Sequence, residues 1–126
     1  DDGSIWRNLV TEAKAKVAES LDEYRGAFAY NLLDEHARRF GASVPIIAQW
    51  DDHEVVDNWF HDLVLANDAR YSEKRVRVLA ERAKQAFFEF LPIRRHPTDA
   101  GRVYRQFRYG PLLEVFVVDV RSYRGA

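Results

Sequence analysis

The sequence lacks both cysteine and methionine among its 126 residues. Without cysteine, the chain forms no disulfide bond, no thiolate zinc site and no cysteine nucleophile, although this absence does not decide the cellular compartment. Because the first residue is Asp1 and no methionine occurs, we expect that the chain begins inside a longer gene product.

Long hydrophobic runs are also absent. No stretch of about 18 consecutive apolar residues occurs, so the sequence predicts no transmembrane helix. No basic segment followed by an apolar one opens the chain, so no signal peptide is visible in it. The composition is 47% hydrophobic and 31% charged, which is typical of a globular chain rather than a disordered one. Its length suits one compact domain.

The net charge of −1 indicates no particular partner, but the charges are unevenly distributed. Residues 1–69 contain 14 acidic and 6 basic residues, whereas residues 70–126 contain 6 acidic and 13 basic ones. Between Phe40 and Ala69 there is no lysine or arginine, and the acids there are Asp51, Asp52, Glu54, Asp57, Asp62 and Asp68. This asymmetry predicts either one site that holds cations and a phosphate, or two complementary surfaces that pack together.

Apolar residues spaced three and four apart predict three helices. The first begins between Ser4 and Thr11 and ends before Gly26. The second covers residues 27–40 and stops at Gly41. A third helix follows Ser72 as its cap and ends at about Leu91, before Pro92.

Two regions predict β-structure. Residues 44–49 are short, apolar and rich in β-branched side chains, which indicates one isolated buried strand. Residues 103–109 alternate in polarity, Gly110 and Pro111 turn the chain, and residues 112–118 form a strand expected to be buried on both faces. The expected fold class is therefore α/β. An isolated strand needs neighbours, so we expect residues 1–126 to be one partial domain.

Residues 51–54 read Asp-Asp-His-Glu and directly follow the predicted strand. In open α/β sheets, ligands bind beyond the carboxyl ends of strands. Carboxylates there hold cations that activate water for attack on phosphorus, and a neighbouring histidine contacts or protonates the phosphate ester. The alternative is a helix start with Asp51 as its N-cap and Glu54 at the third helical position. These residues alone leave both interpretations open.

Residues 49–55, followed by Asn58 and Trp59, resemble the central motif of the PhoD-like (alkaline phosphatase D) family of calcineurin-like metallophosphoesterases. Further stretches resemble the same family in the same order. They are residues 21–26 with 30–35, residues 86–94, and residues 104–110 running into 118–124. The resemblance covers the chain from about Trp6 to Gly125.

This resemblance implies that the chain is an internal fragment of a four-layer α/β/β/α sandwich with a dinuclear centre of divalent and trivalent ions, such as Ca²⁺ and Fe³⁺. It implies hydrolysis of phosphomonoesters and phosphodiesters. By position, Asp52 is the expected metal ligand, Asp51 is a second candidate, and His53 is expected to contact the phosphoryl group. Arg121 and Asn58 are the expected substrate-binding residues.

The sequence departs from the family pattern in several places. Asp57 stands where the family often has asparagine, and residues 118–121 read Val-Asp-Val-Arg instead of Leu-Asp-Thr-Arg. The family's Gly-Asp ligands and later histidine ligands have no counterpart here. We therefore expect the remainder of the parent domain to supply most metal ligands, and this chain alone to be inactive.

The alternative is a non-catalytic fragment, or a structural or interaction module without a complete metal site. Nucleic acid is not an expected partner, because the bases in residues 70–84 are interrupted by acids and accompany no recognition motif. Export to the periplasm or the cell exterior is an expectation that rests on the resemblance alone.

Overall fold

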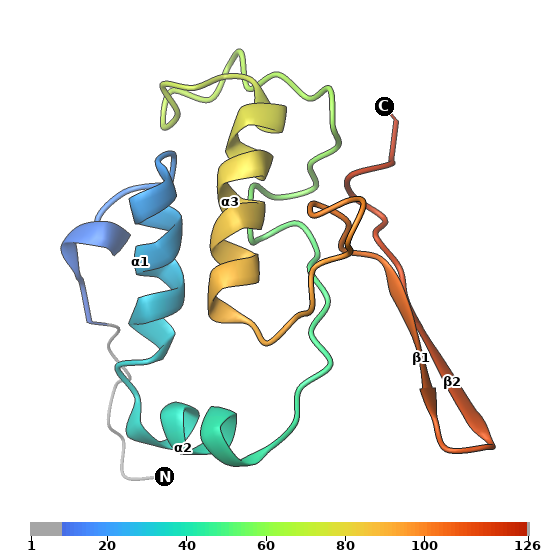
Figure 1. Ribbon diagram of the computed structural model, residues 1–126. Coiled ribbons are helices and arrows are strands. Elements are labelled where there is room, and N and C mark those ends of the chain that lie inside the picture. The colour runs from blue at the N-terminus through green and yellow to red at the C-terminus, as the bar shows by residue number, and fades with distance from the viewer. Residues whose placement is uncertain (1–8, 126) are drawn as a thin grey trace, which may run out of the picture.

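The computed structural model describes residues 9–125 and has a mixed α/β fold (Figure 1). Helix α1 lies beside α3, the segment between α2 and α3 winds along the other side of α3, and the hairpin projects away from the helices. In chain order the elements are η1 (Glu12–Lys14), α1 (Leu21–Asn31), α2 (Glu35–Ser43), α3 (Val76–Phe90), β1 (Arg105–Tyr109) and β2 (Leu113–Val117). No described helix has the length and apolar character needed to cross a membrane.

Helix α1 begins at a capping box. The Ser20 hydroxyl accepts a hydrogen bond from the Glu23 backbone N–H at 3.3 Å, and the Glu23 carboxylate accepts one from the Ser20 N–H at 2.8 Å. Because Ser20 has an extended backbone, no helix continues through it from the N-terminal side. The first predicted helix is therefore wrong for residues 9–20, where only η1 forms, and is confirmed for residues 21–25, which belong to α1. Its earliest proposed start, Ser4, lies outside the described residues.

The second predicted helix is divided in two. Helix α1 continues to Asn31, and the Asp34 carboxylate then accepts a hydrogen bond from the Ala37 N–H at 2.7 Å and starts α2. Neither glycine ends a helix as predicted, because Gly26 lies inside α1 and Gly41 inside α2. Gly26 instead permits a close approach, since a Cβ there would collide with the Cβ of Ala13.

The isolated strand predicted at residues 44–49 is not formed. The segment has no regular secondary structure, and Val44 and Ile47 are 42% and 52% exposed. A strand requires a hydrogen-bonded neighbour, and no strand lies beside this segment within residues 9–125. One side chain binds it, because Arg105 donates a hydrogen bond to the Ala48 carbonyl oxygen.

The third helix is confirmed, although α3 begins after Arg75 rather than at Ser72. The backbone N–H groups of Ser72 and Glu73 instead donate to the Glu19 carboxylate at 2.6 and 2.8 Å. The apolar face of α3 forms the centre of the core. Its buried residues are Val76, Leu79, Ala80, Ala83, Ala86, Phe87 and Phe88.

The predicted hairpin is also confirmed. Strands β1 and β2 pair antiparallel with Phe107 opposite Val115, and Gly110 has the positive φ of 69° that the turn requires. The expected burial of β2 on both faces is wrong for the described chain, since Leu113 and Phe116 are 53% and 63% exposed. The hairpin projects away from the helices (Figure 1). Most of its apolar side chains are exposed, and Val117 at the end of β2 is buried.

Replacing Glu23 with glutamine should lower the free energy of unfolding by about 1 kcal/mol at pH 7, because the amide can keep the capping hydrogen bond but loses the negative charge that pairs with Lys16 and with the positive N-terminus of α1. The hydrogen bond from Lys16 and that from the Ser20 N–H lower the pKa of Glu23 to about 2. Its stabilising effect is therefore complete above the unfolded pKa of about 4.3 and is lost as the pH falls toward 2. Urea denaturation should show a smaller difference in stability between the parent chain and Glu23→Gln at pH 2.5 than at pH 7. The control Glu12→Gln, at an exposed position, should have little effect on stability at either pH.

Candidate functional site

The motif loop, residues 50–59, is a series of turns rather than a helix. The Asp52 carbonyl accepts hydrogen bonds from the N–H groups of Val55 and Val56 at 2.8 and 2.9 Å. The Glu54 carboxylate accepts one from the Asp51 N–H at 3.0 Å. This last bond is half of a capping box, but no helix follows it, so the helix-start interpretation is wrong.

Two tryptophans anchor the motif loop in the core. Trp50 and Trp59 are 0% and 1% exposed, and their ring centroids lie 5.4 Å apart in an edge-to-face arrangement. Trp50 also contacts Phe87 of α3, and the Trp59 indole N–H donates to the Asp51 carbonyl at 3.3 Å. The loop backbone is therefore fixed on both sides of the acidic residues.

Asp52 is a buried carboxylate with two polar partners. One oxygen accepts a hydrogen bond from the Asn58 backbone N–H at 2.8 Å and lies 3.2 Å from Nη2 of Arg121. Asn58 itself has a positive φ of 55°, so the chain turns sharply at the residue whose N–H Asp52 binds. The Asn58 N–H and, to a smaller extent, the Arg121 charge lower the pKa of Asp52, so its side chain stays ionised at neutral pH.

Arg121 joins the two adjacent aspartates. Its Nε lies 2.7 Å from the Asp51 carboxylate, and only 13% of its side chain is exposed. The Asp119 carboxylate accepts hydrogen bonds from the backbone N–H groups of Arg121 and Ser122, at 3.1 and 2.9 Å, and so fixes the turn that carries this arginine. The bond to Asp51 is the main cause that raises the pKa of Arg121.

His53 and Asp57 lie at the exposed side of the same loop. The His53 Nε2 atom is 3.6 Å from the Asp57 carboxylate, and the Asn58 side-chain amide donates to that carboxylate at 3.1 Å. One donor atom each from Asp52, His53 and Asp57 lies within 4.8 Å of the others. Two carboxylates and one imidazole suit hard or borderline cations, so these residues fit a metal ion.

The structure thus brings all five predicted site residues to one place. Asp57 was not predicted as a ligand, although it belongs to the acidic stretch before Ala69. Asp57 lies close to His53 because the chain turns at Asn58. That turn depends on a hydrogen bond to the Asp52 side chain and is not apparent from residue spacing.

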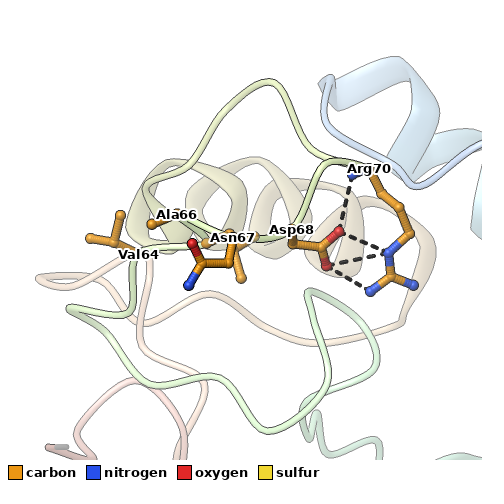
Figure 2. A pocket seen from close by; sticks show the side chains of 6 residues that line it. Val64, Ala66, Asn67, Asp68 and Arg70 are labelled. Carbon is orange, nitrogen blue, oxygen red and sulfur yellow. Dashed lines mark hydrogen bonds and ion pairs between the residues drawn. The ribbon is translucent and has the colours of Figure 1, made fainter.

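Among the hollows of the described chain, two lie beside acidic loop residues. One, of about 1010 Å³, is lined by residues of the motif loop, by α1 and by residues 9–18. The other, of about 470 Å³, lies in the loop before α3. There the Asp68 carboxylate binds Arg70 at 2.7 Å, and none of the candidate residues contributes (Figure 2). Of these two, the first hollow adjoins the candidate site.

Comparison with known proteins gives one family. The model of the PhoD-like phosphatases matches residues 1–126. Alkaline phosphatase D of Bacillus subtilis (strain 168) is 32% identical over 123 residues, which cover 93% of this chain and 20% of that relative. The chain therefore spans about a fifth of the length of the curated relative it matches. No solved structure matches. Since the family model covers the whole sequence, the chain belongs to the PhoD-like phosphatase family.

Proposed function

We propose that this chain supplies one part of the active site of a metal-dependent phosphatase that hydrolyses phosphomonoesters and phosphodiesters. The observation that carries the proposal is the cluster of Asp52, His53 and Asp57, whose donor atoms lie within 4.8 Å of one another on a firmly anchored loop. The family match and the similarity to alkaline phosphatase D support the same reaction class.

In this proposal Asp52 and Asp57 hold a cation, and His53 contacts the phosphoryl group. The His53 side chain is 81% exposed, which leaves it accessible to a substrate. When bound, the ion polarises the phosphoryl oxygen and activates water. The resemblance favours Ca²⁺ and Fe³⁺ for the complete centre.

Asp51, Asn58 and Arg121 support this arrangement. Asp51 was the second candidate ligand, and its ion pair with Arg121 favours a role in orienting that arginine. Arg121 uses Nε and Nη2 for the two aspartates, and we propose that Nη1 contacts the phosphate. Asn58 positions both Asp52 and Asp57, through its backbone and its side chain respectively.

We propose that residues 1–126 are part of a single larger domain with the four-layer α/β/β/α arrangement. The exposed apolar side chains of the hairpin and the unpaired segment 44–49 support this, because both would gain partners from further strands. The remaining metal ligands would come from the same additional segments. Residues 1–126 alone should then bind a metal weakly and turn over no substrate.

The proposal is tested by measuring Mn²⁺ binding and hydrolysis separately. In residues 1–126, Asp57→Asn should weaken Mn²⁺ binding at least about tenfold, the lower range seen when metal-site residues are changed. Asp62→Asn, an exposed change in the same acidic stretch, should leave binding unchanged. Calorimetric titration would measure both, and equal affinities in the two variants would contradict the assignment of Asp57.

Hydrolysis is assayed on bis(4-nitrophenyl) phosphate with Ca²⁺, Mn²⁺ and Fe³⁺ supplied. The complete gene product should release 4-nitrophenol, and residues 1–126 alone should not. A complete gene product that carries metal and yet hydrolyses neither this diester nor 4-nitrophenyl phosphate would overturn the proposed function.

A further inference from the structure

The larger hollow extends beyond the residues that carry the phosphate and metal chemistry proposed above. Its volume of about 1010 Å³ is in the range that holds small organic ligands. Asp52 and His53 line one part of it. Apolar and aromatic side chains line much of the rest, among them Val17, Phe28 and Tyr30. A group bound there would therefore be adjacent to a phosphate held by His53.

The hollow exists because residues 9–18, the N-terminal segment, are held against α1. The absence of a side chain at Gly26 allows Ala13 to approach the helix closely. Lys16 adds an ionic link, with its Nζ atom 2.8 Å from the Glu23 carboxylate and 3.3 Å from that of Glu19. The charge of Lys16 is therefore paired within the protein.

The other lysine of this segment is also engaged. The Lys14 Nζ atom lies 5.9 Å from the centre of the Tyr30 ring, within the range of a cation–π contact. With Lys16 paired to carboxylates, the lining offers little attraction to a second anion. It favours instead a group with an apolar surface.

Tyr24 gives the hollow one unsatisfied polar group. The residue is 4% exposed and lines the hollow, and its buried hydroxyl has no hydrogen-bond partner among residues 9–125. A buried donor without a partner is unfavourable, and a ligand oxygen would supply one. Since the hydroxyl is shielded from solvent in the free chain, this contact requires a neighbouring side chain to shift.

We propose that this hollow binds the alcohol part of the phosphoester and selects an alcohol with a flat apolar ring that carries an oxygen acceptor for Tyr24. The inference rests on the proposed phosphatase function, because the phosphate is placed by His53. To that function it adds a class of substrate. Phosphoesters of ring-bearing alcohols are preferred to phosphoesters of polyols and of alcohols with a second negative charge.

The binding test uses residues 1–126 without metal and follows backbone amide signals by NMR. Diphenyl phosphate should bind about tenfold more tightly than dimethyl phosphate, because a ring buries enough apolar surface for such a difference. The shifted signals should include those of Ala13 and Phe28. Equal affinities, or shifts confined to other parts of the chain, would overturn the proposal.

Two variants test whether diphenyl phosphate binds in the larger hollow. Ala27→Trp places a large side chain in the hollow and should abolish the preference for diphenyl phosphate. Ala66→Trp makes the same change at the smaller hollow and should preserve that preference (Figure 2).

If the NMR spectrum of Ala27→Trp shows that this variant is unfolded, the location is tested with Tyr24→Phe instead. The parent chain should bind bis(4-nitrophenyl) phosphate a few times more tightly than diphenyl phosphate, and Tyr24→Phe should bind both alike.

The outcomes separate this inference from the proposed function. Ring-dependent binding that Ala27→Trp abolishes supports the hollow as a ligand site even if the complete gene product hydrolyses no phosphoester. Conversely, hydrolysis with no preference between ring-bearing and glycerol phosphodiesters would leave the phosphatase proposal intact and refute the assignment of the hollow.

Discussion

Asp52→Ala in the complete gene product is expected to lower kcat/KM for bis(4-nitrophenyl) phosphate by about 10²- to 10³-fold, the scale seen when a metal or charge-stabilising contact is removed. Asp52 is the one buried acid of the candidate cluster, and its pKa is lowered, so it offers a fixed negative charge at neutral pH. Metal content should fall with activity. The two quantities are measured by steady-state kinetics and elemental analysis of the same preparation.

The same substitution should also destabilise the protein, because it leaves the Asn58 N–H without its acceptor and the Arg121 guanidinium with Asp51 as its remaining aspartate partner. An unsatisfied buried partner of this kind costs about 1–3 kcal/mol. Asp52 has a lowered pKa in the folded state, so its stabilising effect is present above the unfolded pKa of about 3.9 and is lost as the pH falls below it.

Asp52→Asn and Asp62→Ala are the matched comparisons. Asp52→Asn preserves the shape of the side chain, so it should lose metal and activity but less stability than Asp52→Ala. Asp62→Ala should retain its metal content, activity and stability. An Asp52→Ala protein with unchanged activity and metal content would refute the assignment of Asp52.

Trp50→Ala is expected to lower the free energy of unfolding by about 3–5 kcal/mol, as for other buried tryptophans. Trp50 is fully buried, packs on Trp59 and Phe87, and has the Lys84 Nζ atom 5.5 Å from its ring centre. Domains are stable by only about 5–15 kcal/mol. The loss is therefore a large fraction of the total stability, and the motif loop should lose its anchor.

Urea denaturation followed by circular dichroism measures this effect. Trp50→Phe should cost less, since the Trp50 indole N–H is buried without a partner in the described chain and phenylalanine removes that group. Tyr109→Ala, at a 73% exposed position on the hairpin, should change stability by less than about 0.5 kcal/mol. Equal effects of the changes at Trp50 and Tyr109 would contradict the anchoring role.

Local sequence pattern predicted the elements that depend mainly on local interactions. The periodic apolar face of α3 and the turn at Gly110 are apparent in the sequence and are present in the structure. The start of α1 was also encoded locally, as Ser20 followed three residues later by Glu23, but apolar spacing before it suggested an earlier start. The apolar run at residues 44–49 was misleading, because a strand depends on a neighbour that periodicity does not reveal.

The candidate site also combines features that the local sequence predicts with features that depend on tertiary contacts. The motif placed Asp52 and His53 correctly on one loop, because they are adjacent in the chain. The contact between Arg121 and the aspartates 70 residues earlier is tertiary, and the proximity of Asp57 to His53 depends on the turn at Asn58. Neither is determined by spacing alone.

The link between Arg121 and the motif loop sets the order in which the site matures during synthesis. Synthesis runs from the N-terminal end, so Trp50, Trp59 and α3 are all made before residue 91. Every buried residue of their core cluster except Val103 is then already present. Asp51 and Asp52 obtain their cationic partner only after residue 121 has left the ribosome, so until then two neighbouring negative charges stand without it.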